Sequence, residues 1–331
     1  MSSTLDPARR AALVGSSLRA LVTDAGATPM GDPVGIGTGA AIMADDGTAW
    51  VLLVDEPIGG LGGALAWAIR RAASGLHVVA SGRTGVLARR ATSFAFPVAI
   101  SHLEGRTMVP AIAEPLVPAV PLTERHRVLV PLIIAGGAEP VEEHGVLVGE
   151  VAGLEVCRVV DDPQTGEVRL EVGIGAHDRE TFQMLHGDRP TVEALADVVR
   201  SVGAHRCVGA PQHPLNQLAA SRLLRARIMA DPSLVGTGPL VGVAPPAART
   251  NLKDEVPCVA RETDGDRIVV FTTGVDLDAV PWAGDAATIH GATECIIAAP
   301  ARDVIDIQQR LAALVIVPTR FVPIDPLAGA R

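Results

Sequence analysis

The chain has 331 residues, 48% of them hydrophobic, which predicts two or three domains with ordinary hydrophobic cores. Its formal net charge is −9 and Lys253 is its only lysine, so a basic surface for nonspecific nucleic-acid binding is not expected. The lack of tyrosine, with only five Phe and three Trp residues, also leaves few rings on which bases could stack.

Residues 1–108 predict an N-terminal α/β arm. A helix is expected from Leu5 to Gly26, because Asp6 can cap it and Pro7 suits its first turn. The Gly-rich segment Gly31 to Gly39 is expected to be a loop, followed by a β-hairpin about Asp45-Asp46-Gly47. The arm's other elements are predicted as strands at Ala40 to Met43 and Trp50 to Val54, a helix at Gly62 to Ala73, a strand at Leu76 to Ala80, a helix at Thr84 to Ser93 and a strand at Phe96 to His102.

Residues 109–145 are interpreted as a Pro-rich crossover with short extended pieces, because their six prolines exclude a continuous helix or a central strand. Residues 146–230 then predict a central β-hairpin, with strands near Leu154 to Val160 and Val168 to Val172. Three helices should follow it, at Asp178 to Leu185, Thr191 to Val202 and Leu215 to Met229. Residues 231–256 form a second Pro/Gly-rich connector.

Residues 257–331 predict a C-terminal α/β arm with the element order of the first arm: hairpin, helix, strand, helix and strand. Its elements are expected at Pro257 to Arg261, Arg267 to Thr273, Asp278 to Ile289, Cys295 to Ala299, Val304 to Leu314 and Arg320 to Ile324. The predicted fold class is α/β, with two similar mixed-sheet arms flanking a central β-hairpin and helical segment. Common descent of the two arms is a hypothesis.

Acidic groups concentrate in the central hairpin. Glu155 lies in a strand that is apolar on both faces, so its carboxylate must be paired, protonated or bound to a metal. Glu171 alternates with Arg169 on the next strand, and the two glutamates approach only in a register that places both on one face. In the alternative interpretation Glu155 pairs with an arginine such as Arg158 or Arg169, and Glu171 is solvated.

The strand-to-helix junction that follows carries His177, Asp178 and Arg179. Carboxylate oxygen and imidazole nitrogen within one turn are ligands that a divalent metal accepts. The candidate site therefore comprises Glu155, Glu171 and Asp178 as ligands of Mg²⁺ or Mn²⁺, with His177 beside them and Arg179 steadying a phosphate. Alternatively, Asp178 caps the helix and His177 is a surface residue.

The acidic hairpin followed by helix, strand, helix and strand resembles the core of the restriction-endonuclease-like, PD-(D/E)xK nuclease superfamily. Glu155 would match its first acidic position, and Leu170-Glu171-Val172-Gly173 its (D/E)xK tripeptide. In the first arm, Val51 to Pro57 would match the same tripeptide and Leu76 to Ala80 the later core strand.

The sequence departs from that family at its lysine. Gly173 and Pro57 stand in the lysine's position, and the C-terminal arm offers only Phe271-Thr272-Thr273. What the resemblance implies is a nuclease-like fold and divalent-metal-dependent phosphodiester hydrolysis.

Two Gly-rich segments are candidates for nucleotide binding. Gly35 to Ala40 nearly matches a dinucleotide fingerprint, but a strand follows it, so a loop is favoured. Gly59, Gly60, Gly62 and Gly63 have a strand before them and a helix after, which would aim backbone N–H groups at an anion of a cofactor. A flexible connection is the alternative, because the Lys-Ser/Thr of a phosphate-binding loop is missing.

A helix that begins near His213 carries Arg222, Arg225 and Arg227, for which internal salt bridges are expected in so acidic a chain. The cysteines lack metal-ligand spacing and are expected to be buried free thiols; they are Cys157, Cys207, Cys258 and Cys295. A cytoplasmic location is expected, because the first ten residues lack an apolar signal core and no apolar stretch is long enough to span a membrane.

Three functions are open from the sequence. The first is a non-catalytic binding or assembly protein built on degenerate nuclease-like units, acting as a homo-oligomer or with a protein partner. The second is a divalent-metal-dependent phosphodiester hydrolase that uses the acidic residues of the central hairpin. The third is a nucleotide-binding protein that uses Gly59 to Gly63.

Overall fold

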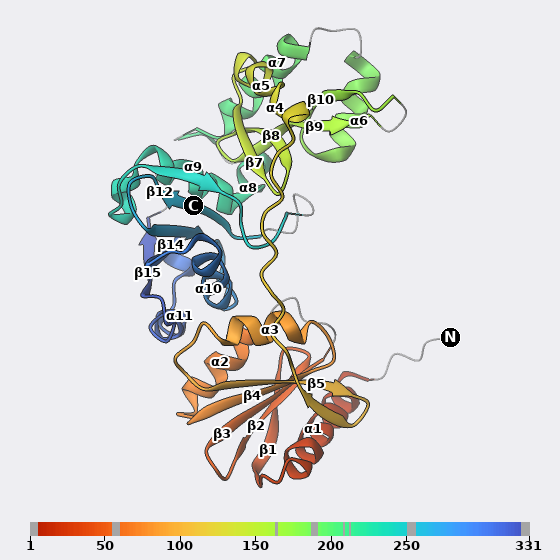
Figure 1. The fold of residues 1–331 in the computed structure, drawn as a ribbon, viewed down its shortest axis with the longest axis vertical. Coiled ribbons are helices and arrows are strands. Elements are labelled where there is room, and N and C mark those ends of the chain that lie inside the picture. The colour runs from red at the N-terminus through yellow and green to blue at the C-terminus, as the bar shows by residue number, and fades with distance from the viewer. Residues whose placement is uncertain are drawn as a thin grey trace. The chain divides into compact units, whose positions relative to one another are not determined.

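The computed structural model describes residues 6–54, 60–162, 165–186, 191–207, 209–211, 213–249 and 256–325 (Figure 1). These residues form a mixed α/β chain, as the sequence predicts, and the expected central hairpin is part of a third sheet beside those of the two arms. The chain divides into two compact units. Residues 1–116, 276–288 and 305–320 form the first, and the second comprises residues 117–275, 289–304 and 321–331.

The first unit contains a six-stranded sheet in the order β1-β2-β3-β4-β5-β6. Strands β1 to β3 are antiparallel, β3, β4 and β5 are parallel, and β6 returns antiparallel to β5. The elements are α1 (Pro7–Asp24), β1 (Pro29–Ile36), β2 (Gly39–Ala44), β3 (Thr48–Leu53), α2 (Leu61–Arg70), β4 (Gly75–Ala80), α3 (Thr84–Ala91), β5 (Val98–Glu104) and β6 (Thr107–Pro110).

Side chains that alternate along the strands build the core of this sheet. Leu18 and Val22 of α1 pack against Ile42, Trp50 and Leu52 of β2 and β3, and all five are at most 5% exposed. The hairpin about Asp45-Asp46-Gly47 and the helices and strands expected after it are confirmed, within a few residues at their ends. None of the helices in the described ranges combines the length and apolar character needed to span a bilayer.

The expectation of a loop over Gly31 to Gly39 is wrong, because β1 covers most of this segment. The strand lies at the edge of the sheet, where one side of a strand has no partner. Pro29 and Pro33, which lack a backbone N–H, are tolerated in such a strand. Most of its side chains are exposed, so the period-two alternation of a half-buried strand is missing from its sequence.

Two helices of the C-terminal arm, α10 (Ala279–His290) and α11 (Asp306–Ala312), contribute to the first unit. A short antiparallel bridge pairs Phe94 with Val315, and the Ala95 N–H donates to the Leu314 carbonyl at 2.8 Å. The helices of this arm and its sheet therefore fall in different units, a division that the expected boundary at residue 257 does not reproduce.

The second unit contains two sheets. A four-stranded antiparallel sheet has the order β10-β9-β8-β7, and a five-stranded sheet, whose last strand begins in residues of the first unit, has the order β11-β12-β13-β14-β15. Their strands are β7 (Glu139–Glu143), β8 (Val146–Val151), β9 (Leu154–Asp161), β10 (Val168–Val172), β11 (Leu240–Val243), β12 (Cys258–Glu262), β13 (Arg267–Phe271), β14 (Glu294–Pro300) and β15 (Thr319–Ile324). The predicted central hairpin is β9 and β10, and β13 runs parallel to β14.

The helices of the second unit range from 4 to 15 residues in length. They are α4 (Glu124–Arg127), α5 (Val130–Ala135), α6 (Gly175–His186), α7 (Thr191–His205), α8 (Pro214–Gln217) and α9 (Ala220–Ala230), with 3₁₀ turns at Pro232–Val235 and Ala301–Asp303. The single helix expected from Leu215 to Met229 is wrong, because Ala219 adopts a φ of 49° and divides it. Between residues 109 and 145 the expected short extended pieces are present as the end of β6, the irregular residues 111–123 and β7, and the division between the two units falls between residues 116 and 117. The helices α4 and α5 were not expected there; Pro131 lies in the first turn of α5, and Pro140 in an edge strand.

Candidate functional site

A β-bulge in β9 determines where Glu155 points. Gly149 of β8 pairs with Cys157, but the next residue, Glu150, pairs with Glu155, so Val156 is an extra residue in β9. Because of the bulge, Glu150 of β8 and Glu155 of β9 lie directly opposite each other in the paired strands. Two like charges in such a pair repel each other, so cations are needed to stabilise this arrangement.

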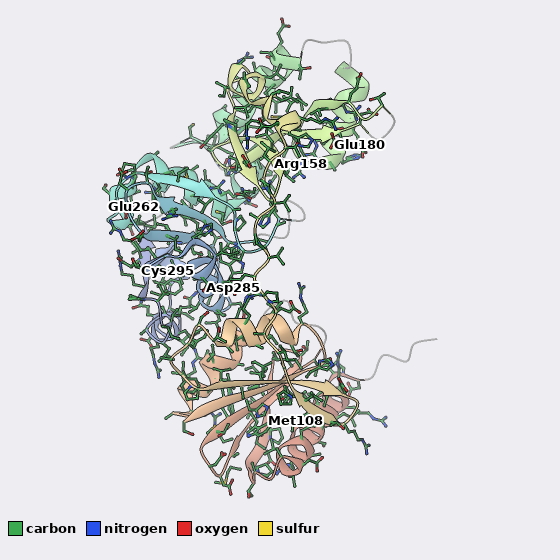
Figure 2. The ribbon with its side chains drawn as sticks, in the orientation of Figure 1. Met108, Arg158, Glu180, Glu262, Asp285 and Cys295 are labelled. Carbon is green, nitrogen blue, oxygen red and sulfur yellow. The ribbon has the colours of Figure 1, made fainter. Side chains whose placement is uncertain are left out.

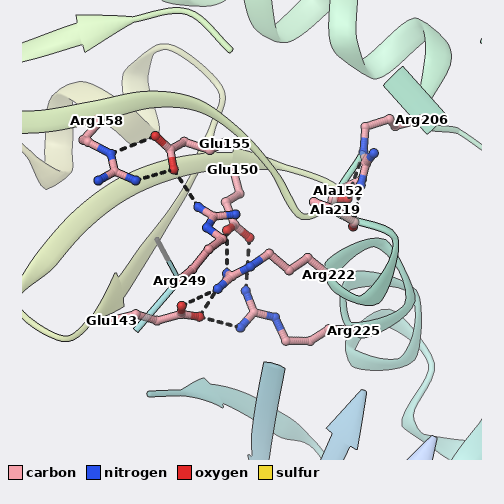
Figure 3. A network of polar contacts seen from close by, with 10 residues as sticks. All are labelled: Glu143, Glu150, Ala152, Glu155, Arg158, Arg206, Ala219, Arg222, Arg225 and Arg249. Atoms are coloured by element: carbon pink, nitrogen blue, oxygen red, sulfur yellow. Dashed lines mark hydrogen bonds and ion pairs between the residues drawn. The ribbon is translucent and has the colours of Figure 1, made fainter. Parts of the chain in front are cut away.

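Three arginines surround Glu155, whose side chain is 2% exposed; Figure 3 shows two of them, Arg158 and Arg249. Arg158 donates from Nε and Nη2 to the two carboxylate oxygens at 2.8 Å each. Arg179 donates from Nη1 to Oε1 at 2.8 Å, and Arg249 from Nη2 to Oε2 at 2.6 Å. The interpretation that Glu155 pairs with an arginine such as Arg158 or Arg169 is therefore confirmed through Arg158. Arg169 binds Asp162 and Glu171 instead.

Two arginines of α9 hold the second glutamate of the opposed pair. Arg222 and Arg225 donate to the two oxygens of Glu150 at 2.9 and 3.1 Å, and both also bind Glu143 of β7. The expected internal salt bridges are thus confirmed for these two residues. Arg227 donates instead to the backbone carbonyl of Asp325, at 2.7 Å.

Glu171 joins this ion cluster through Arg179. Its Oε1 accepts from Arg169 Nη2 at 2.8 Å, and its Oε2 lies 3.5 Å from Arg179 Nε. The structure therefore brings Glu155, Glu171 and Arg179 together, with the guanidinium between the two carboxylates. The expectation that Glu171 is solvated is wrong, because its side chain is 22% exposed and paired on both oxygens.

His177 and Asp178 lie in the first turns of α6, and both are exposed. The helix begins at Gly175, three residues before the expected start at Asp178, so Asp178 is not its N-cap residue. Its Oδ2 instead accepts from the backbone N–H of Ile174, which precedes the helix, at 2.7 Å. In the part of the chain that the structure describes, no group of three or more His, Cys, Asp or Glu side chains is placed to hold a metal ion. The metal hypothesis for Glu155, Glu171 and Asp178 stays a prediction, and their oxygens accept hydrogen bonds from this chain's own donors.

The charges of this cluster are strongly coupled. Burial alone would raise the pKa of the Glu155 carboxyl, but the hydrogen bonds and charge of Arg158, with the charges of Arg249 and Arg179, hold that pKa below its ordinary value. Glu143 behaves in the same way: its pKa is lowered by the arginines of α9 against the effect of burial. Both carboxylates are therefore ionised in the folded protein at neutral pH.

We expect the cluster to make stability depend on pH in acid. A carboxyl whose folded pKa lies below its unfolded value, about 4.3 for Glu, contributes stability that is fully present above that value and is lost as pH falls through the folded pKa. Urea unfolding between pH 7 and pH 3 should show the free energy of unfolding falling below about pH 4.3. Glu155→Gln should flatten this dependence, and an equal slope in that variant would contradict the assignment.

The Gly-rich cradle before α2 also binds a carboxylate of this chain. The backbone N–H groups of Gly60 and Gly62 donate to Asp278 Oδ2 and Oδ1 at 2.7 and 2.9 Å, within the first unit. The predicted anion-directed N–H groups are thus present, and they hold an internal anion. Nothing lies within 4 Å of the Cβ that a side chain would add at Gly63, and Gly59 lies outside the described residues.

Sequence reasoning missed several members of these groups. Glu150 could have been found, because it is a glutamate within an apolar stretch, as Glu155 is. Arg249 could not, because it follows a Pro-rich segment that predicts only a connector. A second buried ion group was also missed: Asp285 of α10 (Figure 2) accepts from Arg89 and Arg90 at 2.8 to 3.1 Å. Cys157, Cys258 and Cys295 are buried as expected, but Cys207 is exposed.

Comparisons of the chain with models of known protein families, with curated proteins and with solved structures returned no match.

Proposed function

We propose that this chain is a non-catalytic binding or assembly protein, whose acidic cluster fastens the four-stranded sheet to helix α9. The observation that carries the non-catalytic assignment is the saturation of Glu155: its two buried oxygens accept four hydrogen bonds from three arginines. The ion pairs to α9 are made by Glu143 and Glu150. Metal or acid–base chemistry needs a carboxylate oxygen that can reach a metal or a substrate. Here the guanidinium groups take those positions.

The position of α9 explains what such a cluster does. Leu224 and Ile228 of this helix pack into the core of the five-stranded sheet, while Arg222 and Arg225 reach the glutamates of β7 and β8. The cluster therefore joins two cores of the second unit. A buried ion group of this kind contributes little net stability compared with apolar packing, but breaking one partner is costly, so it favours a single arrangement of the parts it joins.

Exposed apolar side chains in the first unit support a binding role. Ile112 is 88% exposed directly after β6, and Val109 within that strand is 40% exposed. Met30 and Val34 of β1, at the opposite edge of the sheet, are 56% and 43% exposed. Apolar groups that gather at sheet edges are typical of surfaces that receive another protein or a second copy of the chain.

The metal-dependent phosphodiester hydrolase is the alternative. The hairpin, helix and strand order that suggests it is present in both arms, but the acidic pair of the first arm, Asp55 and Glu56, lies outside the described residues. A nucleotide-binding role would require a ligand anion to replace Asp278 at Gly60 and Gly62.

One experiment separates the proposal from the hydrolase. The purified chain is heated with and without 5 mM MgCl₂ or MnCl₂ and is also incubated with bis(p-nitrophenyl) phosphate. We expect no metal-dependent shift in melting temperature and no p-nitrophenol release. Cleavage that needs metal, is lost in Glu171→Ala and is kept in Glu180→Ala, an exposed control on α6, would overturn the proposal.

A further inference from the structure

An apolar groove runs beside β5 in the first unit, between the C-terminal half of α3 and the segment that follows β6. Its volume is about 530 Å³, within the range of sites that bind ligands or peptide side chains. Twelve of its thirteen lining residues are apolar, and the other is Thr92. The side chains of the groove therefore suit apolar groups, while the backbone atoms exposed among them add polar surface.

The backbone of β5 is open on the side of this groove. Strand β6 pairs only with Ser101–Glu104, and one further hydrogen bond joins the Ala111 N–H to the Ile100 carbonyl at 2.9 Å. Backbone groups two residues apart in a strand point to the same side, so the N–H and carbonyl of Val98 point outward as Ile100's carbonyl does. On this outward side, no strand in the described residues pairs with β5 before Ser101.

The inward side of β5 is already paired. The Leu76 N–H donates to the Pro97 carbonyl at 2.9 Å, and β4 matches β5 from Val98 to His102. The hydrogen bonds that join β5 to β4 therefore come from the residues on either side of Val98. The N–H and carbonyl of Val98 itself are available to a segment that lies along the open edge of the strand. Pro97 and Pro110 bound the open stretch, which limits the pairing to a short segment.

We propose that this groove and the open edge of β5 bind an extended apolar segment of a partner protein, which adds as a strand beside Val98. The proposal rests on the binding role proposed above and names its site. Unpaired main-chain groups require a partner with a peptide backbone, which distinguishes such a segment from an apolar small molecule. The uncharged lining requires that the inserted side chains be apolar.

Two variants of the full-length chain test the site. Val98→Pro removes the outward N–H and leaves the hydrogen bond between Leu76 and Pro97 in place. Ala95→Arg introduces a charge at an exposed lining position, while the backbone bond to Leu314 remains. Melting curves show whether each variant is folded. If Val98→Pro does not fold, the binding measurement on Ala95→Arg tests the site alone.

The probe is a fluorescein-labelled peptide of alternating valine and threonine flanked by lysines, followed by fluorescence anisotropy. We expect saturable binding of the peptide to the wild-type chain. The dissociation constant should rise at least tenfold in both variants. It should rise by the same factor when the wild-type chain is titrated with a peptide that is N-methylated at alternate residues. Absence of saturable binding, or equal binding of the N-methylated peptide, would overturn the proposal. So would a concentration-dependent dimer that Val98→Pro abolishes, because a second copy would then occupy the groove.

This result is independent of the metal experiment. A chain that binds no peptide and shows no metal-dependent cleavage loses the groove assignment alone, whereas metal-dependent cleavage removes the binding role itself.

Discussion

Replacing Glu155 by alanine is expected to lower the free energy of unfolding by about 3 to 5 kcal/mol. The change leaves Arg158, Arg179 and Arg249 facing one another around a site that is 2% exposed in the native protein. The loss has two sources: the attraction to the carboxylate disappears, and three guanidinium groups keep the cost of leaving water. Urea unfolding at pH 7, followed by circular dichroism, measures it.

A matched control is Glu124→Ala, which removes an exposed carboxylate paired with Arg127 one turn away on α4. Its glutamate side chain is 83% exposed, so the change should cost less than about 1 kcal/mol. Glu155→Gln keeps the volume and some hydrogen bonds and should lie between the two. Equal effects of Glu155→Ala and Glu124→Ala would show that the cluster does not hold this part of the chain.

Local patterns in the sequence predict most of the elements. The Pro7 signal of α1, the Asp45-Asp46-Gly47 turn and the short β-branched runs are properties of adjacent residues, and the structure confirms them. Asp6 occupies the N-cap position of α1, but its side chain makes no capping hydrogen bond. The same reasoning fails for β1, because an exposed edge strand lacks the alternation on which a prediction depends. It also fails at Ala219, whose left-handed backbone has no glycine to signal it.

The candidate site was predictable only in part. A glutamate inside an apolar strand must be paired, which correctly singles out Glu155, and Arg158 is near enough in sequence to be named as its partner. The remaining partners are set by tertiary structure: Arg179 arrives with α6 and Arg249 from 94 residues farther along the chain. The bulge at Val156, which sets Glu150 against Glu155, has no glycine or proline in β9 itself to mark it; the adjacent glycine, Gly149, lies in the paired strand.

The Gly-rich segment before α2 shows the same limit. Local geometry correctly predicts that Gly60 and Gly62 aim N–H groups at an anion, since a strand precedes them and a helix follows. The identity of that anion depends on a residue 216 to 218 positions later, Asp278. A fingerprint of this kind therefore predicts a chemistry of binding, while the fold decides whether the partner is a cofactor or the chain itself.

Alanine substitutions at two adjacent glycines of α2 are expected to change stability in opposite directions. A Cβ on Gly62 would lie 2.1 Å from the Leu277 carbonyl oxygen and 2.7 Å from the Asp278 backbone nitrogen. Backbone atoms cannot rotate away as a side chain does, so Gly62→Ala should cost about 3 kcal/mol, at the upper end of overpacking effects. The two N–H bonds to Asp278 should weaken as the segments separate.

Gly63 is the matched control, because nothing lies within 4 Å of the Cβ that alanine would add there. Gly63→Ala lowers the conformational entropy of the unfolded chain and should stabilise the fold by about 0.5 to 1 kcal/mol. Thermal and urea unfolding of both variants measure the difference. If Gly62→Ala proved as stable as Gly63→Ala, the residues around Asp278 would not approach α2 as closely as the structure places them, and the internal carboxylate would not fill the glycine cradle.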